Sequence, residues 1–172
     1  MSNPILRNSF RFLVLVLLQI FVFNRIYLGG YLNPYVYLMF ILLLPFETPW
    51  WLLLISSFSI GLSVDTLSGS LGIHAAAATL AAFVRPLVIK LMFPKLDRTS
   101  HVVPGINFMG IPAFAVYVFI VVFIHHFFLF FLEVFRFSEI VPVLFRIGLS
   151  SLLSSALIIL LEIIFKSYRK GV

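Results

Sequence analysis

Long apolar segments dominate this sequence and restrict it to a membrane fold. Runs rich in Leu, Ile, Val and Phe follow one another with only short polar stretches between them. Of the 172 residues, 62% are hydrophobic and only 10% are charged. A soluble domain carries about 25% charged residues, so this chain cannot cover a core with a polar surface. We therefore expect one integral membrane domain over residues 1–172.

Six apolar segments are candidate spans, because about 20 helical residues cross a bilayer core. The second is short and, as a helix, covers only about two-thirds of that core, which leaves open a thinned bilayer, an extended backbone or a re-entrant segment. The expected fold is an all-α polytopic bundle of six transmembrane helices. The expected spans are about 10–23, 35–46, 50–67, 73–93, 109–132 and 142–165.

The basic residues predict the orientation of these spans. Lys and Arg collect before the first span, between spans four and five, and after the last span. The other loops hold Arg25 and Arg136, and Arg146 lies just inside span six. Because cytoplasmic loops are enriched in Lys and Arg, six spans with both termini in the cytoplasm fit best. The charges flank apolar segments rather than form one basic face, so the expected partner is the lipid bilayer and not nucleic acid.

The stretch from Gly61 to Ala75 carries the most informative polar residues. Asp65 lies near the end of span three, where an ionised carboxylate needs a partner or water. Glycines on both sides of Asp65, Gly61 and Gly72 among them, permit close helix approach, and those after it permit a sharp reversal. One interpretation is that Asp65 caps the reversal or the N-terminus of span four. The other is a polar contact between Asp65 and His74 inside a site.

Span four combines small residues with a cation, Arg85, which is close enough to the cytoplasmic end to snorkel partly. The alanine-rich run 75–82 predicts a central helix packed by its neighbours, with a binding groove as the alternative. Pro86 removes one helical hydrogen bond and can kink the helix. Arg85 lies towards the cytoplasmic end, which makes Glu47 a better placed partner than Asp65.

Catalytic and cofactor motifs are not evident in the sequence. Adjacent His125 and His126 point about 100° apart on a helix, which favours interhelical hydrogen bonding over metal binding. The turn at Gly69–Gly72 lacks the spacing and the triad partners of a serine hydrolase. We expect no catalytic residues, no metal site and no cofactor.

Several motifs, taken in order, resemble the MreD family of bacterial rod-shape-determining proteins. The likeness extends over nearly the whole chain, and Gly61-x-x-x-Asp65 with Gly72-x-His74-Ala75 is its most specific part. The other matching stretches are Leu43-Leu44-Pro45-Phe46-Glu47-Thr48-Pro49-Trp50-Trp51, Phe83-Val84-Arg85-Pro86, and His125-His126 with Leu132-Glu133-x-Phe135.

This resemblance implies a non-enzymatic inner-membrane scaffold of the cell-elongation machinery. Such a protein binds the single-span protein MreC and helps couple cytoskeletal filaments to peptidoglycan synthesis by RodA and its transpeptidase. The implied fold is similar to the substrate-binding (S) subunits of energy-coupling-factor transporters, which makes transport the alternative function. The matching residues are then determinants of fold or interface: Gly61, Asp65, Gly72, His74, Arg85 and Pro86.

Cavities and grooves separate the two functions. An enclosed cavity near the outer side, lined by polar residues from several spans, would favour transport. An exposed apolar groove would favour a scaffold.

Overall fold

The computed structural model describes residues 4–26, 32–95, 102–134 and 140–170, and every regular element among them is helical. Five of these helical segments are long and apolar enough to cross a membrane. The fold is therefore the expected all-α membrane bundle. The elements are α1 (Pro4–Phe21), the 3-10 helix η1 (Phe23–Arg25), α2 (Leu38–Leu42), α3 (Trp50–Ser68), α4 (Ile73–Met92), α5 (Ile106–Val134) and α6 (Ile140–Lys170).

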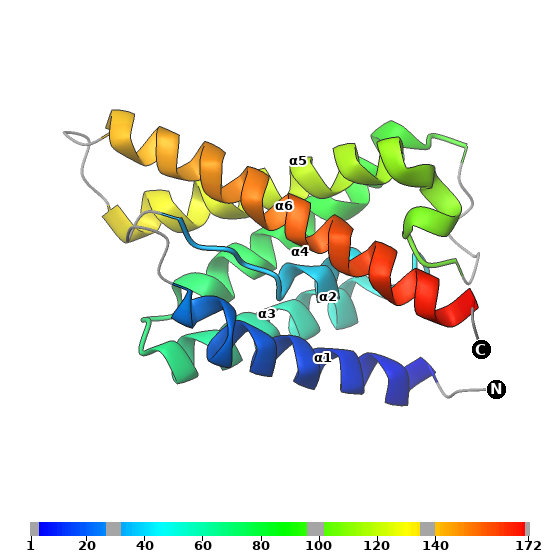
Figure 1. Ribbon diagram of the computed structural model, residues 1–172, viewed down its shortest axis with the longest axis horizontal. Coiled ribbons are helices and arrows are strands. Elements are labelled where there is room, and N and C mark those ends of the chain that lie inside the picture. Colours follow the sequence, from blue (N-terminus) through cyan, green and yellow to red (C-terminus); the bar gives the residue numbers. More distant parts are fainter. Residues whose placement is uncertain (1–3, 27–31, 96–101, 135–139, 171–172) are drawn as a thin grey trace.

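The helices form an elongated bundle in which consecutive helices pack side by side. The pairs α3–α4, α4–α5 and α5–α6 make the main contacts, and α1 packs against α2 and α3. The start of α1 and the end of α6 lie at the same end of the bundle, and the short turn between α3 and α4 lies at the other (Figure 1). Loop residues Arg98 and Arg136, which contributed to the predicted orientation, lie outside the described residues.

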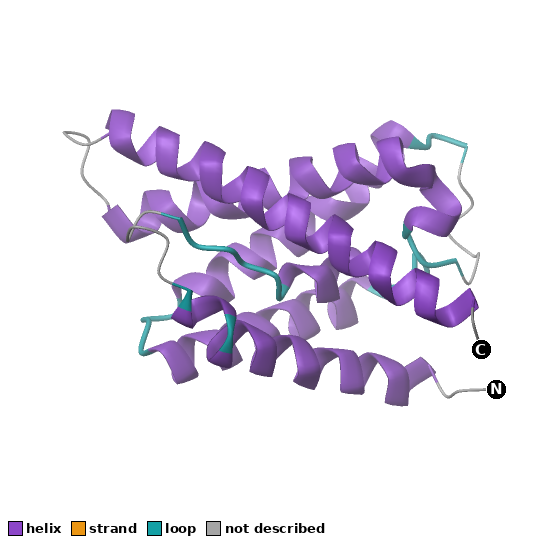
Figure 2. Ribbon diagram, viewed as in Figure 1, coloured by secondary structure: helices purple, strands orange, loops and turns teal. Residues whose placement is uncertain are grey.

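The prediction of a second transmembrane helix is wrong, because residues 35–46 do not form a membrane-length helix. Only Leu38–Leu42 is α-helical, and the residues before it, 32–37, form irregular backbone that ends in a turn. This segment runs through the middle of the bundle between the long helices (Figure 2). In hydrocarbon such backbone is tolerated only when it is buried in protein and its polar groups are satisfied.

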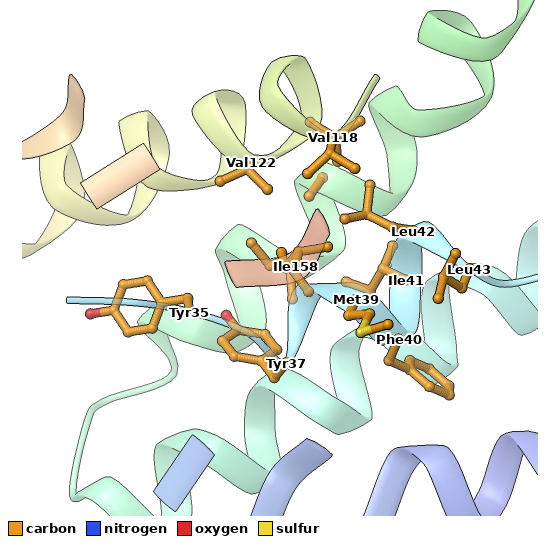
Figure 3. Close-up of a cluster of buried hydrophobic side chains, with 14 of the residues drawn as sticks. Tyr35, Tyr37, Met39, Phe40, Ile41, Leu42, Leu43, Val118, Val122 and Ile158 are labelled. Atoms are coloured by element: carbon orange, nitrogen blue, oxygen red, sulfur yellow. The ribbon is translucent and has the colours of Figure 1, made fainter. Parts of the chain in front are cut away.

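The same segment is the centre of the hydrophobic core. Every residue from Tyr35 to Leu44 is buried, and most are less than 5% exposed. Val118 and Val122 from α5 and Ile158 from α6 are drawn beside it in the close-up (Figure 3). The short element is therefore enclosed by the long helices rather than placed against lipid.

The long helices follow the sequence prediction closely. On α4 the buried face is alanine-rich, which confirms the expectation of a central helix packed by its neighbours: Ala75, Ala77, Ala78, Ala81 and Ala82. On α5 a ladder of phenylalanines faces outward instead: Phe119, Phe123, Phe127 and Phe131. Gly110, at φ 75° and ψ 162°, interrupts the first turns of α5, which begins slightly earlier than expected.

Candidate functional site

Helices α3 and α4 approach each other closely at Gly61. A Cβ atom on this residue would lie 2.5 Å from the carbonyl oxygen of His74 and 2.6 Å from the Cα of Ala75. Both are backbone atoms, which cannot move aside as a flexible side chain can. The absence of a side chain at Gly61 therefore permits the α3–α4 contact.

Asp65 joins the end of α3 to the start of α4. Its Oδ2 accepts a hydrogen bond from the backbone N–H of Ala75 at 2.8 Å, and its Oδ1 accepts one from the N–H of His74 at 3.1 Å. Oδ1 also accepts the Ser70 hydroxyl at 2.6 Å. These N–H groups belong to the first turn of α4, where the helix dipole favours an anion. Asp65 thus caps α4, as the first interpretation proposed.

Glycine conformation shapes the turn that brings this carboxylate to α4. Gly69 ends α3 at φ 73°, and Gly72 precedes α4 at φ 83°. Both values lie in the left-handed region, which glycine adopts without steric cost. The four residues of the turn, 69–72, therefore fold back within a short distance and set Asp65 over the new helix.

Replacing Asp65 with alanine is expected to lower the free energy of unfolding by about 2 kcal/mol, because two buried N–H groups lose their acceptor. Asp65→Asn should lose about half as much, since its one carbonyl oxygen can still serve a single N–H. Denaturation of the purified protein in detergent measures both changes. Glu133→Ala, which removes an exposed ion pair with Arg146, is the matched control and should cost less than about 1 kcal/mol. Unchanged stability in both Asp65 variants would exclude the capping role.

Tyr37 links two histidines from different helices. Its hydroxyl lies 2.6 Å from Nε2 of His125 on α5 and 3.4 Å from Nδ1 of His74 on α4. A hydroxyl has one proton, so Tyr37 donates to only one of these rings at a time. The contact between Asp65 and His74 runs through the His74 backbone, and the His74 ring is used for Tyr37 instead.

His126 ties α5 to α6 and to the segment before α2. Its Nδ1 lies 2.8 Å from the carbonyl oxygen of Val122, which can only accept, so this nitrogen carries a proton. In the neutral ring Nε2 is then an acceptor, and it accepts a hydrogen bond from the Ser154 hydroxyl at 3.1 Å. Ser154 Oγ in turn accepts the backbone N–H of Tyr35 at 2.9 Å. His126 thus makes an interhelical hydrogen bond, as predicted, whereas His125 bonds Tyr37, which precedes α2.

Gln19 on α1 satisfies the backbone where α2 begins. Its Oε1 accepts the N–H groups of Val36 at 2.8 Å and Tyr37 at 3.3 Å. Its Nε2 donates to the carbonyl oxygen of Pro34 at 3.0 Å and to Oδ1 of Asn24 at 2.8 Å. Gln19 is fully buried. One side chain therefore replaces hydrogen bonds that a continuous helix would have supplied itself.

Arg85 performs the same task where α2 ends. Its Nη2 donates to the carbonyl oxygen of Leu44, and its Nε donates to the Tyr117 hydroxyl at 3.0 Å. The Tyr117 hydroxyl in turn donates a hydrogen bond to the carbonyl oxygen of Leu42 at 3.0 Å. Arg85 is only 2% exposed, so it stays within the bundle instead of extending its charge to the surface. Glu47, its predicted partner, lines the same cavity as Arg85.

Two open cavities mark the ends of the bundle. A cavity of about 460 Å³ lies beside the α3–α4 turn and includes Asn24, Ser70 and His74 in its lining. Another of about 510 Å³ lies at the end that holds the termini, and Glu47, Arg85 and Pro86 line it. Pro86 therefore lies within α4 at the cavity wall, whereas Gly61, Asp65 and His74 converge at the α3–α4 contact.

Side chains that could bind a metal ion do not cluster in the part of the chain that the structure describes. No group of three or more His, Cys, Asp or Glu side chains there is arranged to hold an ion. The rings of His125 and His126 have centroids 5.3 Å apart, and their hydrogen bonds diverge to Tyr37 and Ser154. Both rings therefore take part in hydrogen bonds within the bundle.

Gln19, Ser150 and Ser154 belong to this hydrogen-bond network, and the sequence prediction did not include them. Gln19 is the chain's only glutamine and lies in an otherwise apolar span, which was an available signal. Ser150 and Ser154 lie one helical turn apart on α6, and both are buried. Comparisons with family models, with curated proteins and with solved structures found no match for the chain.

Proposed function

We propose that this chain is a membrane scaffold of the MreD type, which binds an MreC-like single-span protein in the inner membrane of a bacterium. Through that partner it helps couple cytoskeletal filaments to the peptidoglycan synthase RodA and its transpeptidase. One observation carries the proposal. The motif that resembles the family most specifically includes Gly61, Asp65 and His74. These three residues meet at the α3–α4 contact, where they pack the helices together and cap α4.

The distribution of charge and tryptophan supports an orientation with both termini in the cytoplasm. Arg7, Arg11, Lys90 and Lys95 belong to the end of the bundle that holds the termini, while Arg25 lies at the other end. Trp50 and Trp51 begin α3 at the first of these ends and are 46% and 64% exposed. Basic residues favour the cytoplasmic side, and exposed indoles favour the interface.

Exposed apolar side chains on the long helices support binding through helix faces. Each of α1, α3, α4, α5 and α6 carries large hydrophobic side chains that are more than a third exposed. A partner with one transmembrane helix can meet such a surface within the membrane.

Transport by an S-type subunit is the second candidate, and the outer cavity of about 460 Å³ is the observation that favours it. Its polar lining, however, is largely used within the protein. Asn24 is bonded to Ser68 and Gln19, Ser70 to Asp65, and His74 to Tyr37. Few of these groups remain to recognise a ligand, and the cavity is open rather than enclosed. These contacts support the scaffold.

Complementation tests the proposed function directly. A tagged copy of this chain, expressed in a rod-shaped bacterium that lacks its own MreD, should restore the length-to-width ratio of the cells and co-purify with MreC. The Gly148→Ala variant, in which the new Cβ meets no atom within 4 Å, should behave like the unaltered chain. Microscopy and quantitative immunoblotting of the purified complex provide the two measurements.

Normal accumulation in the membrane without either rescue or MreC binding would refute the scaffold. Transport predicts a different outcome, in which the purified chain is stabilised against heat by a water-soluble vitamin and co-purifies with the energy-coupling membrane subunit. Substituting Asn24 should then abolish that stabilisation, because Asn24 lines the outer cavity.

A further inference from the structure

A slot between α1 and α6 combines a polar chamber with an apolar groove. The groove has a volume of about 200 Å³, and Phe10, Val14, Met39 and Phe165 line it. The neighbouring chamber has about 380 Å³ and is bordered by Val102, Val103 and Gly105. Both share Arg7, Arg11, Leu43, Asn107 and Glu162. A polar compartment thus continues directly into an apolar one.

Charge at the junction of the two compartments favours an anion. Arg7 and Arg11 lie one helical turn apart on α1 and are accompanied by a single acid, Glu162, which leaves a formal excess of one positive charge. The Nε atom of Arg7 is buried and has no hydrogen-bond partner. A buried donor without an acceptor is costly, so an anionic group entering the chamber would gain a favourable contact. Arg11 already donates from Nη1 to the carbonyl oxygen of Leu43 at 3.1 Å.

The junction of an apolar groove with a basic chamber favours a phospholipid, whose acyl chain and anionic headgroup match the two compartments. A flexible hydrocarbon chain can lie in the groove while its headgroup remains in the chamber. Basic pockets between helices at the cytoplasmic side are also where anionic headgroups bind.

We infer that this slot binds one anionic phospholipid, with its phosphodiester beside Arg7 and Arg11 and an acyl chain along Val14 and Met39. The site does not depend on the proposed scaffold function, because its argument uses only the residues that line the slot, which come from α1, the α2 segment, the start of α5 with the residues before it, and α6. A bound lipid there would fill space between α1 and α6.

Native mass spectrometry of the full chain in non-ionic detergent tests the site with two probes. Phosphatidylglycerol and phosphatidylcholine with identical acyl chains should bind unequally, with phosphatidylglycerol preferred. Arg7→Gln should weaken phosphatidylglycerol binding about fivefold, which is the effect of about one basic residue near an anionic lipid. Arg25→Gln removes the same charge at the opposite end of the bundle and should leave binding unchanged.

Photo-crosslinking identifies the occupant in native membranes. A photoreactive amino acid at Val14, which lines the groove, should acquire the mass of a phospholipid. Crosslinking to another protein or to a second copy of this chain would overturn the lipid assignment. Equal binding of the two lipids, or an equal loss of phosphatidylglycerol binding in Arg7→Gln and Arg25→Gln, would overturn it as well. So would stabilisation of the protein by inorganic phosphate alone that equals its stabilisation by phosphatidylglycerol.

Discussion

Replacing Gln19 with leucine is expected to lower the free energy of unfolding by about 3 kcal/mol or more. Leucine has a similar volume but offers no acceptor to the N–H groups of Val36 and Tyr37, which Gln19 Oε1 receives at 2.8 and 3.3 Å. Each buried N–H group left unpaired costs about 1–3 kcal/mol, and the carbonyl oxygen of Pro34 loses its donor too. Unfolding in mixed micelles with increasing fractions of a denaturing detergent measures the loss.

Asn24→Ala is the matched control for this prediction. It removes the hydrogen bond between Gln19 Nε2 and Asn24 Oδ1 while Gln19 continues to serve Val36 and Tyr37. Because Asn24 is exposed, water can replace the lost contacts, and the cost should stay below about 1 kcal/mol. Similar losses in Gln19→Leu and Asn24→Ala would show that Gln19 does not support the start of α2.

Substituting Gly61 with alanine is expected to be as damaging, although it adds a single methyl group. Its Cβ would lie 2.5 Å from His74 O and 2.6 Å from Ala75 Cα, so α3 and α4 must separate. Overpacking of this kind typically costs about 1–3 kcal/mol. Here it also moves the N–H groups of His74 and Ala75 away from Asp65. We therefore expect a loss of about 3 kcal/mol and low accumulation in the membrane.

Gly148→Ala separates this steric effect from a general effect of alanine. Gly148 lies within α6, and a Cβ there meets no atom within 4 Å. Alanine is a better helix former than glycine by about 1 kcal/mol, so this variant should be as stable as the unaltered chain or slightly more stable. If Gly61→Ala also leaves the thermal unfolding temperature unchanged, the close α3–α4 approach is not required.

The buried polar groups explain how a membrane bundle can hold an irregular segment at its centre. Gln19 supports the start of α2, and Arg85 with Tyr117 supports its end. These three side chains come from α1, α4 and α5. The segment therefore fixes the positions of several helices relative to one another.

Much of the fold could be predicted from local patterns. Apolar runs located α3 and α4 to within a residue or two, because a helix in lipid must satisfy its backbone internally. The glycines at positions 69 and 72 marked the turn between them, since each adopts a positive φ. Capping by Asp65 was one of the two interpretations that its place at that turn allowed, because the helix start to be capped is close in sequence.

The sequence by itself thus determined the membrane class, the long helices and the local cap. Only the tertiary structure decided the form of residues 33–44 and the partners of Gln19, Arg85 and His126. Residues 38–44 are all apolar, as expected both for a short transmembrane span and for a segment buried in the protein, so hydropathy does not distinguish the two. The deciding hydrogen bonds join residues far apart in the chain, such as Tyr35 with Ser154 and Arg85 with Leu44. Such pairings depend on how the helices pack, which periodicity along one helix does not encode.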